Sequence, residues 1–144
     1  MSMELFVILA ASQAPDVAAW NSALSAARVP ASLDEHVTLS KHTGFLPATV
    51  NGKATGFYFL RESYQELSSR NPKIAQLRVS NPIVYSLGFG GDPRECAAVF
   101  YSATVLVTNF GGNAFDPQED ALMNANELLA VAKECDGSTA KKAK

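Results

Sequence analysis

A chain of 144 residues is long enough to form one domain with a sizeable core, and 47% hydrophobic with 18% charged residues is typical of a folded globular protein. The formal net charge of −2 argues against a nucleic-acid binder, because such proteins concentrate positive charge on one face. No apolar run reaches the ~20 residues of a membrane-spanning helix, so we expect a soluble, cytoplasmic protein that contacts neither nucleic acid nor membrane.

The chain opens with the pattern of a buried strand followed by a helix. The run Glu4–Ala11 is almost continuously apolar and no basic residue precedes it, which favours a strand over a signal peptide. Pro15 and Asp16 suit the first turn of a helix, which ends at Pro30 because proline cannot continue it. Four apolar residues recur at helical spacing between these points: Val17, Trp20, Leu24 and Ala27.

A β-hairpin is the clearest signal in the middle of the chain. The pair Asn51-Gly52 tolerates the positive φ angles of a type I′ turn, so Gly44–Val50 and Lys53–Leu60 are predicted to pair as antiparallel strands. Further strands are predicted at Ile74–Val79 and Pro82–Gly88, where short apolar runs lie between turn residues.

The segment Gly88–Gly91 (GFGG) lies between an apolar run and a predicted helix, and two interpretations are open. A phosphate-binding loop would have a third glycine or a Gly-Lys-Ser/Thr sequence at the helix start, but Pro93 stands there. Asp92 is a helix N-cap, which places a carboxylate on the amides that an anion would need. A simple turn is therefore favoured, leading into a buried helix that ends at a C-cap on Gly111.

The last predicted helix begins at Asp116-Pro117, after a short strand at Asn113–Phe115, and ends at Gly137. Residues 1–137 are predicted to form a single α+β domain, and the basic segment 138–144 to form a disordered tail. The order of elements predicts a two-layer sandwich. In it, a mixed or antiparallel sheet with a central hairpin is packed by about three helices.

Residues that could support catalysis are few. His36 and His42 lie near carboxylates in a polar segment, but their spacing fits no metal motif, and solvated loop histidines are the simpler interpretation. Cys96 and Cys135 follow no zinc or redox spacing, which favours two free thiols in a reducing compartment. We therefore predict no cofactor and no metal, and the sequence leans away from an enzyme.

Two groups of polar residues are candidates for a protein-binding surface. The first directly follows the hairpin and consists of Glu62, Tyr64 and Glu66. The second opens the last predicted helix, where carboxylates also stabilise the helix dipole, and consists of Asp116, Glu119 and Asp120. If both groups lie on one side of the sheet, they form an acidic rim suited to a basic partner.

Three stretches of the chain carry a resemblance to a known family. They are GFLP with TGFYF (Gly44–Phe59), FGGDPRE (Phe89–Glu95) and GGNAFDPQED (Gly111–Asp120). In these motifs the chain resembles small bacterial α+β proteins, some of which are immunity proteins of polymorphic or contact-dependent toxin systems. Members of that family often have an acidic residue after the TGF of the hairpin, where this chain has Tyr58. The shared motifs carry no catalytic residues.

The leading hypothesis is therefore a non-enzymatic protein that binds another protein. The resemblance implies an immunity protein, which would neutralise a cognate toxin by occluding its active site. The chain itself is expected to be a monomer or a small homo-oligomer. The alternative is a small enzyme or ligand-binding domain with a pocket near Gly88–Gly91 or His42.

Overall fold

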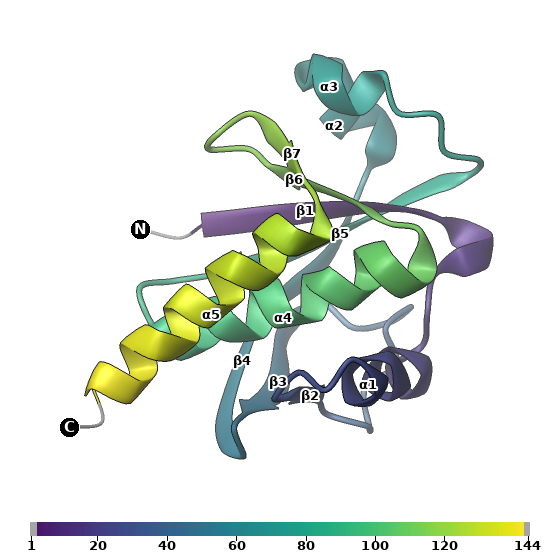
Figure 1. Ribbon diagram of the computed structural model, residues 1–144. Coiled ribbons are helices and arrows are strands. Elements are labelled where there is room, and N and C mark those ends of the chain that lie inside the picture. Colours follow the sequence, from purple (N-terminus) through teal and green to yellow (C-terminus); the bar gives the residue numbers. More distant parts are fainter. Residues whose placement is uncertain (1–2, 143–144) are drawn as a thin grey trace.

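The computed structural model describes the backbone of residues 3–142 and the side chains of residues 3–138. Within that range the chain forms a seven-stranded antiparallel sheet with the strand order β2-β3-β4-β5-β1-β6-β7 (Figure 1). The strands are β1 (Met3–Ala10), β2 (Ala31–Leu33), β3 (Gly44–Val50), β4 (Lys53–Glu62), β5 (Pro82–Phe89), β6 (Asn113–Asp116) and β7 (Ala121–Met123). The α-helices are α1 (Val17–Ala26), α2 (Tyr64–Arg70), α3 (Pro72–Ala75), α4 (Pro93–Phe110) and α5 (Ala125–Lys142).

Helices cover the two faces of the sheet unequally. The helices α1, α4 and α5 pack on the first face, where the main core includes Leu5, Phe57 and Leu87. The short helices α2 and α3 cover only part of the second face, where Phe6 and Phe115 belong to a smaller core. The α+β class and the antiparallel sheet are thus confirmed. The β3–β4 hairpin, however, lies to one side of the sheet, and the described residues form five α-helices rather than three.

The long helix α4 crosses the first face, and its caps are those that the sequence predicts. Asp92 Oδ1 accepts a hydrogen bond from the Arg94 amide at 2.9 Å, and Pro93 takes the first helical position. Gly111 closes the helix in the left-handed conformation, with a φ of 67°. All residues from Ala97 to Leu106 are buried. The caps therefore outweigh the strand preference of its many β-branched residues.

The last helix begins later than the sequence predicts. Asp116 ends β6, and its carboxylate accepts a backbone amide of the following turn at 3.0 Å, so Asp116-Pro117 starts a β-turn and not a helix. The helix α5 follows Asn124, which forms a reciprocal capping box with Glu127 through hydrogen bonds of 3.0 and 2.9 Å. Its backbone also continues through Gly137 to Lys142. Part of the expected tail is therefore helical, and residues 143 and 144 lie outside the described residues.

A helix stands where the sequence predicts a strand at Ile74–Val79. The short α3 occupies the start of that segment, and the chain from Leu77 to Ser80 belongs to no strand. Ile74 is fully buried on the second face, and its carbonyl oxygen accepts a hydrogen bond from the Tyr64 hydroxyl at 3.1 Å. The strand prediction was wrong because Ile74, Leu77 and Val79 pack against the smaller core from a one-turn helix and the irregular segment after it, and neither shows a recognisable periodicity.

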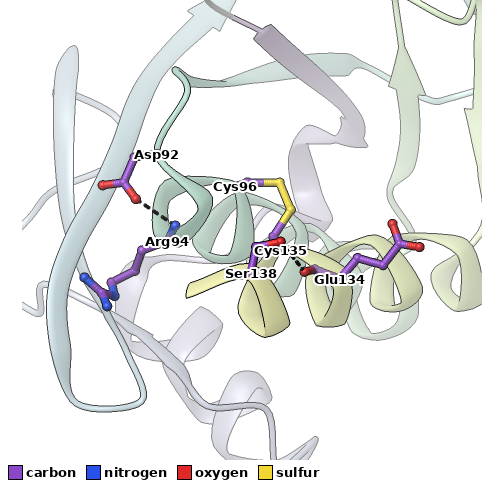
Figure 2. The surroundings of a disulfide bond; sticks show 6 residues. All are labelled: Asp92, Arg94, Cys96, Glu134, Cys135 and Ser138. Atoms are coloured by element: carbon purple, nitrogen blue, oxygen red, sulfur yellow. Dashed lines mark hydrogen bonds between the residues drawn. A yellow bond between two sulfur atoms is a disulfide. The ribbon is translucent and has the colours of Figure 1, made fainter. Parts of the chain in front are cut away.

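A disulfide joins the first turn of α4 to α5. Cys96 and Cys135 are bonded, with their Cα atoms 5.9 Å apart (Figure 2). The prediction of two free thiols is therefore wrong. The two helices pack side by side, which brings together cysteines that are 39 positions apart in the sequence. On the same helix α5, Leu128 and Ala132 are fully buried in the main core. The disulfide at Cys135 therefore fixes a more C-terminal part of α5 to α4.

Asp136, the residue after the disulfide, links α5 to two other elements. Its carboxylate accepts hydrogen bonds from the Tyr101 hydroxyl at 2.9 Å and from the Asn51 side-chain amide at 2.8 Å. Tyr101 lies on α4, and Asn51 lies in the hairpin turn. Burial, this hydrogen bond and the negative charge of Asp136 raise the pKa of Tyr101 from 10.0 to about 12.

We expect the Tyr101 phenol to titrate with a midpoint of about 12 in an ultraviolet absorbance titration. Because this folded-state pKa lies above the ordinary value of 10.0, its contribution to stability is fully present below pH 10 and is lost as the pH rises through about 12. Asp136→Asn removes the negative charge and should lower the midpoint. Tyr101→Phe identifies the signal, and an unchanged midpoint in Asp136→Asn would contradict the assignment.

Candidate functional site

The second face of the sheet is open on β3 and β4, away from the smaller core under α2 and α3. On this face the two strands expose three large apolar side chains, Phe45 (43% exposed), Tyr58 (58%) and Leu60 (40%). Their sequence neighbours Leu46 and Phe57 are fully buried in the main core, so strand alternation directs these three to the other side. We call Phe45, Tyr58 and Leu60 the sheet-face patch. Exposed apolar patches of this kind mark interaction surfaces.

Contacts within the sheet hold the patch in place. Phe45 and Tyr58 are cross-strand partners, and their rings meet edge to face with centroids 5.6 Å apart. The Phe45 ring also lies close over Gly56, where an added Cβ atom would clash with the ring and with the Leu46 carbonyl oxygen. Gly56 has a φ of 156°, which other residues rarely adopt. Gly56, the glycine of the TGF motif, therefore allows the Phe45 ring to pack against the sheet.

A groove of about 360 Å³ adjoins the patch, with Gly88 in its lining. In the strand register Tyr58, Gly88 and Glu4 stand side by side on β4, β5 and β1, so the missing side chain at Gly88 leaves space between the other two. A Cβ atom at Gly88 would have its nearest neighbour, Tyr58 Cβ, at an ordinary 3.6 Å. Glu4 and Glu95 contribute two carboxylates to the groove, and among residues 3–138 no lysine or arginine lines it.

The GFGG segment beside this groove binds carboxylates of the chain itself. Glu95 Oε1 accepts the Gly90 amide at 3.1 Å, and Asp92 caps α4. Two backbone amides that a phosphate would need are thus already occupied by negatively charged groups. Gly88 and Phe89 end β5, and Gly90 and Gly91 connect that strand to the capped helix α4, an arrangement that favours a simple connection over a phosphate-binding loop. A pocket does lie next to Gly88, but its described lining residues include no histidine or cysteine.

Comparison of the chain with protein-family models, with curated proteins and with solved structures gives no match. In residues 3–142, none of the helices is long and apolar enough to cross a membrane. A fold by itself does not specify a function, which depends on the side chains that the fold exposes and on the spaces between them.

The first group of predicted site residues lies at the end of β4 and in α2. Glu62 occupies the same face of β4 as Tyr58 and Leu60, two residues beyond the patch. Tyr64 is half-buried against the smaller core, and its hydroxyl donates a hydrogen bond to the backbone of the neighbouring helix α3. Glu66 is exposed in the first turn of α2. Tyr64 therefore supports the fold, and the two carboxylates are the members of this group that a partner could reach.

The second group lies at the β6–β7 turn and not at a helix start. By strand alternation Asp116 shares the face of Ala114 in the main core, which is opposite to the face of Glu62. Asp120 Oδ2 lies 3.8 Å from Lys73 Nζ on α3, which partly neutralises its charge. Glu119 is exposed. The strands thus do not direct Glu62 and Asp116 to one side, and binding by an acidic rim stays a prediction.

The two histidines have local partners. The His36 side chain is 93% exposed, and its Nδ1 lies 3.1 Å from Asp34 Oδ1. The pKa of Asp34 is lowered by two hydrogen bonds from His36. The bond from the His36 backbone amide has the larger effect, and the bond from its side chain adds to it. His42 Nε2 donates to the Phe45 carbonyl oxygen at 2.8 Å. Within the described residues no three His, Cys, Asp or Glu side chains gather as metal ligands.

Sequence reasoning missed the sheet-face patch, although a signal for it was present. The segment Phe57–Leu60 is apolar at four successive positions, whereas a strand with one solvated face alternates apolar and polar residues. Such a run indicates a strand covered on both sides. Because the described helices leave this part of the second face exposed, the surplus apolar side chains become the candidate site.

Proposed function

We propose that the protein binds another protein through the sheet-face patch and acts without catalysis. The observation that carries the proposal is the exposure of Phe45, Tyr58 and Leu60 on the part of the second face that α2 and α3 leave uncovered. Aromatic side chains are enriched at the centres of protein interfaces, and a rigid sheet fixes their positions before binding. The carboxylates of Glu4 and Glu62 on the same face would meet basic groups at the rim of the interface.

The resemblance to immunity proteins supplies the biological part of the proposal. The partner would be a cognate toxin, and the protein would occlude the toxin's active site. A specific interface of this kind buries roughly 1,200–2,000 Å² in total. The patch and its surrounding strands would form the centre of that area, and no active site is required in this chain.

Tyr58→Ala combined with Leu60→Ala is expected to weaken partner binding by at least about tenfold, because it removes two exposed apolar side chains from the proposed interface. The measurement is affinity capture with the tagged protein, followed by titration of the captured protein against each variant. Leu122→Ala is the matched control, since Leu122 is 42% exposed but lies on the edge strand β7. Equal affinity of all three proteins would exclude the patch as the binding surface.

A second experiment separates binding from the immunity role. The captured partner is expressed alone and together with this protein, and cell survival is counted. Killing by the partner alone, with rescue by the wild type and not by the double variant, supports the immunity role. A harmless partner that still requires the patch would remove that role and leave protein binding intact.

The compartment is also part of the proposal. A cytoplasmic location is expected from the composition together with free thiols, but the structure joins Cys96 to Cys135. Disulfides persist in oxidising compartments and are rare in a reducing cytoplasm. Thiol labelling in intact cells distinguishes the two locations, because two labelled cysteines fit the cytoplasm and a protected pair fits an oxidising compartment.

A further inference from the structure

A second and larger concavity lies on the first face of the sheet, away from the sheet-face patch. Its volume is about 540 Å³, within the range of roughly 300–1,000 Å³ that is usual for small-molecule sites. The walls come from the start of α1, from the segment 35–40 and from the facing ends of β4 and β5. Its ionisable groups are Arg61, Tyr85, Asp16 and Glu35.

Tyr85 is the buried polar residue of this cleft. Its side chain is 4% exposed, and its ring packs between Trp20, at a centroid distance of 6.1 Å, and Phe59, at 4.9 Å. Its hydroxyl forms no hydrogen bond with another described residue, and it is not among the buried polar atoms that lack a partner, so it is accessible from the cleft that Tyr85 lines. Burial raises the pKa of Tyr85, and the nearby charge of Arg61 opposes that shift. The hydroxyl therefore stays protonated at neutral pH and can donate a hydrogen bond to a ligand.

Arg61 stands directly opposite Tyr85 in the β4–β5 register. It occupies the first face of β4, following Phe57 and Phe59, so alternation directs a cation to the side that otherwise holds the core. The Arg61 side chain forms no ion pair or hydrogen bond with another described residue. A guanidinium beside a neutral phenol is well suited to a carboxylate, because both groups only donate hydrogen bonds to it.

Two carboxylates, those of Asp16 and Glu35, give other parts of the cleft wall a negative charge. Asp16 uses Oδ1 to cap α1, accepting the Ala19 amide at 2.8 Å, and Glu35 is exposed on the neighbouring loop. Val17 and Ile83 add apolar surface. One cation and two carboxylates around an apolar space are complementary to a small molecule that carries an anionic group, an ammonium group and an apolar side chain.

We propose that this cleft binds a small amino-acid-like zwitterion. Arg61 and the Tyr85 hydroxyl hold its carboxylate, Asp16 and Glu35 attract its ammonium group, and the apolar wall receives its side chain. This site is independent of the sheet-face patch and does not rest on the protein-binding proposal.

Matched probes can test the assignment of each charge. Leucine is compared with 4-methylpentanoate, which lacks the amine, and with 3-methylbutylamine, which lacks the carboxylate; phenylalanine, 3-phenylpropanoate and 2-phenylethylamine form a second set. Binding is followed by amide chemical shifts of the isotope-labelled full chain, at up to about 10 mM of each probe, where even millimolar affinities are visible. The zwitterion of at least one set is expected to bind best, with shifts at the cleft.

Variants complete the test. Arg61→Gln is expected to weaken both carboxylate-bearing probes about tenfold, and Tyr85→Phe by about three- to tenfold, as for lost charged hydrogen bonds. Asp16→Asn with Glu35→Gln should weaken the zwitterion and leave the simple carboxylate bound, since asparagine also caps a helix. Arg70→Gln, on α2 outside the cleft, is the control.

Two results would overturn the proposal: no cleft shift with any carboxylate-bearing probe, or binding that Arg61→Gln leaves unchanged. Neither result would affect capture of a protein partner through Tyr58 and Leu60. The two proposals can therefore fail separately.

Discussion

Reduction of the Cys96–Cys135 disulfide is expected to lower the free energy of unfolding by about 4 kcal/mol, because the bond closes a loop of 39 positions and restricts the unfolded chain. The measurement is urea unfolding followed by far-ultraviolet circular dichroism, with and without reductant. Reduction should shift the midpoint to lower urea, with the remaining helix and sheet still formed before the transition.

The double variant Cys96→Ala with Cys135→Ala is the control for this experiment. It should unfold near the midpoint of the reduced wild type and should not respond to reductant. If reductant leaves the wild-type midpoint unchanged while mass spectrometry confirms two free thiols, the bond contributes no stability and the loop-entropy argument fails for this chain.

Truncation of Trp20 is the second change with a large expected effect. Trp20 lies on α1 and is completely buried. Its indole Nε1 donates a hydrogen bond to the carbonyl oxygen of Ser102 on α4 at 3.0 Å. Trp20→Ala is expected to lower the free energy of unfolding by about 3–5 kcal/mol, through lost apolar contacts and the cavity left behind. Urea unfolding by circular dichroism measures the change.

Two further variants separate the causes of that loss. Trp20→Phe keeps most of the ring volume and removes the indole hydrogen bond, so about 1 kcal/mol of its cost comes from that bond. Tyr58→Ala truncates an aromatic side chain that is 58% exposed, and it should cost much less than Trp20→Ala. Equal losses for Trp20→Ala and Tyr58→Ala would mean that burial does not determine the effect.

The parts of the fold that the sequence predicted correctly depend on local signals. The Asn51-Gly52 turn has positive φ at both residues, 54° and 76°, as a type I′ hairpin requires. Asp92 and Pro93 begin α4, and Gly111 ends it, because each acts on the backbone within a few residues. An antiparallel sheet packed by helices follows from such elements once their order is known.

The parts that were predicted wrongly depend on contacts between distant residues. Nothing in the spacing of Cys96 and Cys135 reveals that α4 and α5 lie side by side, so the disulfide was missed. The start of α5 was misplaced because Asp116-Pro117 suits a helix start and a β-turn equally well, and the capping box at Asn124 decides between them. The cleft at Arg61 and Tyr85 likewise requires the register of β4 and β5.

The place of β1 in the sheet has a consequence for protein synthesis. This strand is synthesised before both of its neighbours in the sheet, β5 and β6, and Phe6 pairs with Phe115 about a hundred residues later. At roughly 5–20 residues per second the strand waits on the order of ten seconds for its last partner. During that time its apolar side chains, which end up buried on both faces of the sheet, are exposed to other nascent chains. A chain that stops before Asn113 keeps one edge of β1 open permanently, so premature termination products of this protein should aggregate or bind chaperones rather than fold.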